Sequence, residues 1–164
     1  MNGVLSFSRA LLGRRDWVYL LSLLIPFLFY NLALKAADIA SLSGDHGVVL
    51  MRSDVFFNLG YVLLWIGLFA VARERLSRWV VLFSFHAATI LVIIVTTCAH
   101  QYFQETGTTL DYGIIAEWIP KFEEIEPILS QGVPPSAWML LAVALFYAVL
   151  GPWLVARVVE RWRG

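Results

Sequence analysis

The chain has 164 residues, of which 60% are hydrophobic and only 15% are charged, and its mean hydropathy is +0.74. Twelve Lys and Arg residues balance twelve Asp and Glu residues, so the formal net charge is zero. Because soluble domains average about 45–50% apolar and about 25% charged residues, this composition argues against an ordinary soluble protein. We expect membrane lipids as partners and no nucleic acid.

The hydrophobic residues gather in four blocks, at residues 17–37, 55–72, 79–99 and 137–159. Each block is close to the roughly 20 residues that a helix needs to cross about 30 Å of hydrocarbon. The sequence therefore predicts an all-α fold, a polytopic bundle that forms one transmembrane domain over residues 1–164. The first block is longer than the apolar part of a signal peptide, so we expect it to be retained. The single cysteine, Cys98, excludes an internal disulfide.

Basic residues predict the orientation of the bundle in the membrane. Nine of the twelve lie before the first block, between the second and third blocks, or after the fourth: Arg9, Arg14, Arg15, Arg73, Arg75, Arg78, Arg157, Arg161 and Arg163. By the positive-inside rule these regions are cytoplasmic, so both termini are expected inside the cell. The remaining Lys35, Arg52 and Lys121 share the other side with nine acidic residues. Tryptophans mark the block ends, as in an aromatic belt: Trp17, Trp79, Trp138 and Trp162.

Two features of the spans concern helix packing. Pro26 and Pro152 interrupt the first and fourth blocks, and a membrane helix tolerates such breaks where neighbouring groups satisfy the freed carbonyls. Near and within the second block, Ser53, Gly60 and Gly67 recur every seven residues. This spacing puts small residues along one face, where another helix can approach closely.

Polar residues at membrane depth form the most interesting candidate site. Asn31, Lys35 and Asp38 share one face in the outer half of the first helix, and Asp54 and Asn58 form an i, i+4 pair in the second. The third helix adds four polar residues at the same level: Thr96, Thr97, His100 and Gln101. Since such groups usually face the bundle or a cavity, the pattern predicts an outward-facing pocket for a polar or anionic lipid headgroup, with Lys35 as its cation. The simpler alternative is that Lys35 extends to the interface and pairs with Asp38.

The histidines raise a second possibility. His86 and His100 are fourteen residues apart. On one helix this spacing puts them on similar sides and about 21 Å apart along the axis, as in cytochromes with two stacked haems. Each iron would need another axial ligand from a second helix, and His46 is the only other histidine. We therefore expect His86 to be a hydrogen-bonded interior residue and His100 an interfacial one. No zinc spacing, Gly-rich phosphate loop or Ser-His-Asp arrangement occurs, so we assign no catalytic residue, metal ligand or cofactor to this chain.

Residues 100–135 are too polar to lie inside a bilayer, yet they carry a helical apolar pattern. Gly107 is expected to end the third helix, and Thr108 with Asp111 can cap an extracytoplasmic amphipathic helix over about residues 108–126. Its apolar positions are Leu110, Ile114, Ile115, Trp118, Ile119 and Phe122. Pro120 and Pro127 divide it into short pieces. We expect Ile114, Ile115, Trp118 and Phe122 to dock on the bundle or on a partner domain, because the acidic polar face would be repelled by anionic lipids.

Two stretches carry a resemblance to a known family. "SDVFFNLGYVLLW" and "HQYFQETGTTLDYGII", within four hydrophobic helices in this order, resemble the amino-terminal membrane region of bacterial membrane-anchored sulfatases. These proteins are relatives of lipoteichoic acid synthase in the alkaline-phosphatase superfamily. The resemblance implies a fifth helix and then a large extracytoplasmic hydrolase or transferase domain, with a Thr, Ser or Cys nucleophile and divalent metal held by Asp and His. These 164 residues do not contain that domain.

The resemblance implies a membrane anchor and lipid-facing module for an extracytoplasmic sulfatase or phosphoglycerol-transferase-like enzyme. The chain alone is then no enzyme, although its parent protein would be a sulfatase or phosphotransferase type of hydrolase. The alternative is a stand-alone integral-membrane scaffold or subunit that packs against partner membrane proteins.

Overall fold

The computed structural model describes residues 14–41, 47–72, 74–121, 123 and 133–162. Four long helices and two short ones account for nearly all of these residues, and none of them lies in a strand. In chain order the elements are α2 (Arg14–Ser41), α3 (Gly47–Val71), α4 (Arg75–Thr106), α5 (Tyr112–Trp118), the 3₁₀ turn η1 (Ile119–Lys121) and α7 (Pro135–Arg161).

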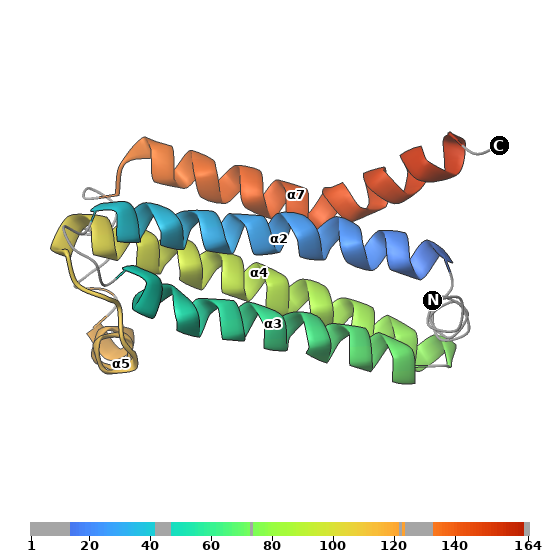
Figure 1. The fold of residues 1–164 in the computed structure, drawn as a ribbon, viewed down its shortest axis with the longest axis horizontal. Helices are drawn as coiled ribbons and strands as arrows, with labels where there is room; N and C mark the ends of the chain where they lie inside the picture. The colour runs from blue at the N-terminus through green and yellow to red at the C-terminus, as the bar shows by residue number, and fades with distance from the viewer. Residues whose placement is uncertain (1–13, 42–46, 73, 122, 124–132, 163–164) are drawn as a thin grey trace.

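The four long helices run side by side, with α2 between α3 and α7 (Figure 1). Helix α2 packs against all three others, and α4 packs against α2, α3 and α7. The start of α2, the end of α7 and the α3–α4 connection lie at one end of the bundle, which we call the termini end. Helix α5 lies at the opposite end, the α5 end, and is seen end-on in Figure 1, so its axis runs across the bundle.

All four long helices are long and apolar enough to cross a membrane. The prediction of an all-helical chain with four helices suited to cross a membrane is therefore confirmed for the described residues, and these helices suggest a multi-pass membrane protein. The helices extend past the predicted blocks: α2 continues to Ser41 rather than residue 37, and α4 to Thr106 rather than residue 99. Hydropathy marks only the part suited to lipid, whereas backbone hydrogen bonding continues into the polar flanks.

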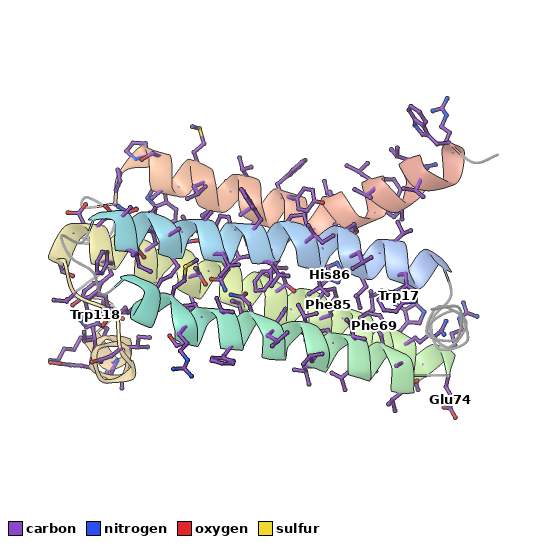
Figure 2. All side chains as sticks on the ribbon, in the orientation of Figure 1. Trp17, Phe69, Glu74, Phe85, His86 and Trp118 are labelled. Atoms are coloured by element: carbon purple, nitrogen blue, oxygen red, sulfur yellow. The ribbon has the colours of Figure 1, made fainter. Side chains whose placement is uncertain are left out.

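Aromatic rings fill the space between α2, α3 and α4. The Phe27 and Tyr61 ring centroids lie 4.8 Å apart, and those of Trp65 and Phe85 lie 5.0 Å apart. Figure 2 shows Phe69, Phe85 and Trp17 toward the termini end. The buried core also includes leucines of α2 and one alanine of α7: Leu20, Leu23, Leu24 and Ala148. Tilted and edge-on ring pairs of this kind stabilise a core beyond their area burial.

Pro26 is accommodated as the sequence predicts. Because Pro26 has no N–H, the carbonyl of Ser22 loses its partner within α2, and the Tyr147 hydroxyl of α7 donates to that oxygen at 2.8 Å. The Tyr147 ring lies over Gly151, where a Cβ atom would be only 2.6 Å from a ring carbon. Pro152 is buried beside it, and α7 bends near its middle (Figure 1). The hydrogen bond from Tyr147 to Ser22 thus ties α7 to α2.

Helix α4 ends at the predicted residue, Gly107. Gly107 ends the helix in the left-handed conformation, with φ of 68°, and its N–H donates to the Phe103 carbonyl at 2.8 Å. A glycine adopts this conformation without steric cost. The prediction that Gly107 ends the third membrane helix is therefore confirmed.

The expected helix over residues 108–126 begins later and is broken earlier. Helix α5 comprises only Tyr112–Trp118. The expectation that Thr108 caps it is wrong, since the Asp111 carboxylate accepts the N–H of Ile114 at 2.9 Å, while the N–H of Thr108 donates to the Thr106 hydroxyl. Pro120 has no N–H for the next helical hydrogen bond, so the chain tightens into η1. Phe122 and Pro127 lie outside the described residues.

Candidate functional site

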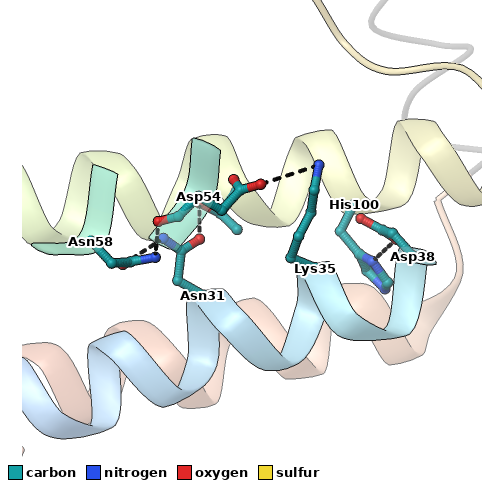
Figure 3. A network of polar contacts seen from close by, with 7 residues as sticks. Asn31, Lys35, Asp38, Asp54, Asn58 and His100 are labelled. Carbon is teal, nitrogen blue, oxygen red and sulfur yellow. Dashed lines mark hydrogen bonds and ion pairs between the residues drawn. The ribbon is translucent and has the colours of Figure 1, made fainter. Parts of the chain in front are cut away.

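The predicted polar residues of α2, α3 and α4 come together at the α5 end of the bundle (Figure 3). We call the following residues the polar cluster: Asn31, Lys35, Asp38, Asp54, Asn58, Thr96, His100 and Gln104. The members on α2 and α4 recur at intervals of three or four residues, so they line the sides of these helices that face one another. The structure thus joins most of the residues that the sequence grouped by helix face and level; of the predicted members, Thr97 bonds Ile93 and Tyr30 instead, and Gln101 bonds none of the cluster residues.

Asn31 is the centre of the cluster. Its side-chain amide donates to the Asn58 oxygen at 3.0 Å, and its own oxygen accepts the hydroxyl of Thr96 at 3.1 Å. Asn58 in turn donates to the backbone carbonyl of Asp54 at 2.7 Å. Asn31 and Asn58 are only 7% and 4% exposed. These bonds therefore satisfy amides that would be costly to bury unpaired.

Asp38 is held from α4. The Nδ1 atom of His100 donates to its carboxylate at 2.6 Å, and the Gln104 amide donates to the same oxygen at 3.1 Å. His100 is thus a member of the cluster and is half-buried. The sequence analysis named Gln101 as the glutamine at this level, but Gln104 is the one that bonds Asp38. Its position one helical turn after His100 is the signal that could have identified it.

Lys35 lies closest to Asp54, whereas the simpler alternative paired it with Asp38. Its ammonium is 3.6 Å from Asp54 Oδ2, across the α2–α3 interface. That oxygen is itself buried and has no hydrogen-bond partner among the described residues, although the two side chains as a whole are 27% and 31% exposed. The 3.6 Å separation makes this a long ion pair, and the partial exposure of both side chains puts it at the edge of the cluster.

Two tyrosines tie α4 to its neighbours along the rest of the bundle. Thr89 and Thr97 donate to carbonyls of their own helix, so Tyr61 and Tyr30 must be the donors in the bonds of 2.7 and 2.6 Å to those threonines. These pairs were missed by sequence reasoning because tyrosines in an apolar span resemble ordinary core residues. Each threonine hydroxyl donates its hydrogen bond to a backbone carbonyl, which has no proton to pass on. The pairs therefore hold helices together and do not form a continuous proton path.

His86 is a hydrogen-bonded, half-buried residue, as expected. Its Nδ1 atom donates to the Leu82 carbonyl at 3.0 Å, so Nε2 accepts the Tyr19 hydroxyl at 3.1 Å. Both ring nitrogens are therefore engaged, and binding a haem iron would require displacing Tyr19. Among the residues that the structure describes, no group of three or more His, Cys, Asp or Glu could hold a metal ion.

The expected docking residues are partly in contact with the bundle. The Trp118 ring meets Tyr102 of α4 edge-on, with centroids 5.5 Å apart, and lies at the α5 end (Figure 2). Ile114 and Ile115 are half-buried, whereas Asp111, Glu117 and Glu123 are exposed. Within α5 itself, Ile114, Ile115 and Trp118 are half-buried and Glu117 is exposed.

No protein-family model matches this chain, and no curated protein or solved structure matches it significantly. The likeness to membrane-anchored sulfatases therefore stays a prediction from the two quoted motifs.

Proposed function

We propose that this chain is the membrane anchor and lipid-facing module of an extracytoplasmic sulfatase or phosphoglycerol-transferase-like enzyme. The observation that supports it best is the gathering of buried polar side chains at one end of an otherwise apolar bundle. Elsewhere the helices expose large apolar side chains such as Phe29, Phe83 and Phe146, which suits a hydrocarbon environment. Hydrogen bonds between the helices at this polar end would hold their outer ends in fixed positions beneath a domain at the membrane surface.

The chemistry of such an enzyme would belong to that domain. A Thr, Ser or Cys nucleophile and a divalent metal are what the resemblance implies there, and the described residues of the present chain offer no metal-binding group. We assign this chain anchoring and lipid contact, and no catalytic step.

The reading frame that follows Gly164 tests the proposal directly. We expect it to encode another apolar segment and then several hundred mostly polar residues that include an Asp/His metal-binding set. A stop codon at this point, with no such domain encoded nearby, would contradict the proposal.

A second candidate is a stand-alone scaffold that packs against partner membrane helices. The observation that favours it is the exposed face of α3. A Cβ added at Gly60 or Gly67 would meet nothing within 4 Å, so the close approach that these glycines permit is not used within the described part of the chain. The stop-codon outcome above would favour this candidate.

The orientation with both termini in the cytoplasm is part of the proposal. In a Cys98→Ala background, cysteines at Ser43 and Gln131 should react with an impermeant thiol reagent in intact cells, because the charge bias puts both segments outside. A cysteine at Ser77, in the turn that opens α4, should react only after permeabilisation. Labelling of Ser77 alone in intact cells would reverse the orientation.

Helix α5 (Tyr112–Trp118) is proposed to be a docking segment at the outer surface. Replacing both Ile115 and Trp118 with aspartate should detach α5 from Tyr102, because burial of each large apolar side chain is worth roughly 1.5–3 kcal/mol. Limited proteolysis between residues 111 and 131 should then accelerate about tenfold or more, while the four spans stay intact. Glu117→Gln, an exposed change on the same helix, is the control. Equal cleavage of all three proteins would mean that α5 is not docked.

A further inference from the structure

The polar cluster leaves one acceptor and one donor incompletely bonded, and they face each other. Asp54 Oδ2 is buried and has no hydrogen-bond partner among the described residues. The Lys35 ammonium is 3.6 Å away. This separation is beyond the usual hydrogen-bond range of about 2.7–3.2 Å. Asn31, Asn58, Thr96 and His100, by contrast, are bonded to one another or to Asp38 and Asp54. Within the polar cluster, incomplete hydrogen bonding is therefore confined to Lys35 and Asp54, whose contact Figure 3 marks with a dashed line.

The charges of the cluster limit which ligand could bind to Lys35 and Asp54. Asp38 and Asp54 face one lysine and His100, so the cluster carries a net charge of −1 with neutral His100 and zero with protonated His100. Arg52, the nearest further basic residue on α3, is turned toward the Phe56 ring, with its guanidinium carbon 5.7 Å from the centroid. A simple anion would meet two carboxylates, and a simple cation would meet Lys35. A ligand that carries both charges suits both residues.

The position of the pair puts it within reach of lipid headgroups. Lys35 lies five residues before the end of the candidate span Trp17–Ala40, and Asp54 lies three residues after the start of the span Met51–Val71. At about 1.5 Å per residue these positions are about 8 and about 5 Å from the span ends. Val55 and Phe56 beside Asp54 are exposed and apolar, as expected of side chains that meet acyl chains.

We propose that Lys35 and Asp54 bind the headgroup of a zwitterionic phospholipid that carries a primary ammonium. Asp54 Oδ2 is enclosed in the lipid-free structure, so the ligand's ammonium takes the place of the Lys35 ammonium beside it and donates to that oxygen. The displaced Lys35 ammonium then donates to the ligand's phosphate. This inference rests on the proposed lipid-facing role and adds the chemical class of the lipid. A primary ammonium is specified because the buried carboxylate oxygen needs an N–H donor, which a quaternary ammonium of the same charge does not have.

Binding of matched lipids to the delipidated chain in detergent, followed by native mass spectrometry, tests the proposal. Phosphatidylethanolamine and phosphatidylcholine with the same acyl chains differ in N–H donors but not in net charge. We expect phosphatidylethanolamine to bind about tenfold more tightly, the difference that one charge-assisted hydrogen bond typically makes. Phosphatidylglycerol, an anion, should bind more weakly than phosphatidylethanolamine. Soluble glycerophosphoethanolamine has the same headgroup without acyl chains, and we expect it to compete poorly with phosphatidylethanolamine because acyl contacts contribute to binding. Strong competition would assign the site to a free zwitterion rather than a lipid.

Two variants separate the contributions of the pair. Asp54→Asn keeps the size of the side chain and the backbone carbonyl that Asn58 uses, and it should abolish the preference for phosphatidylethanolamine over phosphatidylcholine. Lys35→Met keeps the apolar stem and should weaken both lipids about equally, because both carry the phosphate. Glu117→Gln, on exposed α5, should change neither. The circular dichroism spectrum and unfolding midpoint of each variant show whether it is folded.

The contrary results are distinct. Equal binding of both zwitterionic lipids by the wild-type protein, or an unchanged preference in folded Asp54→Asn, would overturn the proposal and leave a pair bridged by water. Tighter binding of phosphatidylglycerol, lost in Lys35→Met, would overturn it in favour of an anion site while keeping the lipid-facing role. Binding of no lipid at all would reject that role as well.

Discussion

Replacing Gly151 with alanine is expected to lower the free energy of unfolding by about 1–2 kcal/mol, the cost of an unpaired carbonyl less the gain in helix propensity. The new methyl group would lie 2.6–2.8 Å from three carbons of the Tyr147 ring, so the ring must move. Its hydroxyl would then leave the Ser22 carbonyl, which Pro26 has already deprived of its helical partner. A buried carbonyl left unpaired costs about 1–3 kcal/mol, and the better helix propensity of alanine offsets up to about 1 kcal/mol of this.

Gly60→Ala is the matched control, because its Cβ would meet nothing within 4 Å. This variant should be as stable as the wild-type protein or slightly more stable, by up to about 1 kcal/mol. Equilibrium unfolding in mixed detergent micelles, followed by helical circular dichroism, measures both. In a Tyr147→Ala background the Gly151→Ala change should no longer be destabilising. A persistent cost there would show that the methyl group clashes with something other than the ring.

Replacing Asn31 with leucine is expected to destabilise the bundle by about 1–2 kcal/mol, the contribution of two interhelical hydrogen bonds in a membrane protein. The change leaves the Thr96 hydroxyl and the Asn58 amide without the partners they have in α2. Each such bond contributes about 0.6 kcal/mol on average and at most about 1.7 kcal/mol, so two lost bonds account for the expected value. The same unfolding measurement applies.

A double-mutant cycle tests whether the cost comes from unpaired partners. Asn31→Leu combined with Asn58→Leu should cost less than the sum of the single changes, because the second substitution removes a group that the first left unpaired. Gln101→Leu removes an amide of α4 near the same depth that bonds none of the cluster residues, and it should stay within about 0.5 kcal/mol of wild type. Additive effects at Asn31 and Asn58 would contradict the pairing.

The outer segment illustrates where reasoning from local sequence fails. Apolar spacing predicted a helix from Thr108, but two competing local bonds decided its start. The Thr108 hydroxyl, which would have to act as the cap, is instead 3.0 Å from the Thr106 hydroxyl, and Asp111 caps the first turn of α5. Periodicity reports which residues could share a face, whereas a helix end depends on which of several nearby side chains reaches the free N–H groups.

The sequence by itself determined the four helices long and apolar enough to cross a membrane, the end of α4 at Gly107 and the level along the helices at which the polar residues lie. These properties depend on composition and on rules that act within one helix, such as the length needed to cross hydrocarbon and the backbone freedom of glycine. Only the tertiary structure decided the partners. Lys35 lies against Asp54, Asp38 accepts from His100, and Tyr147 donates to Ser22, in pairs separated by 19, 62 and 125 residues along the chain. Such pairs depend on the rotation and crossing of each helix against its neighbours, which side-chain packing sets and which no pattern within a single helix contains.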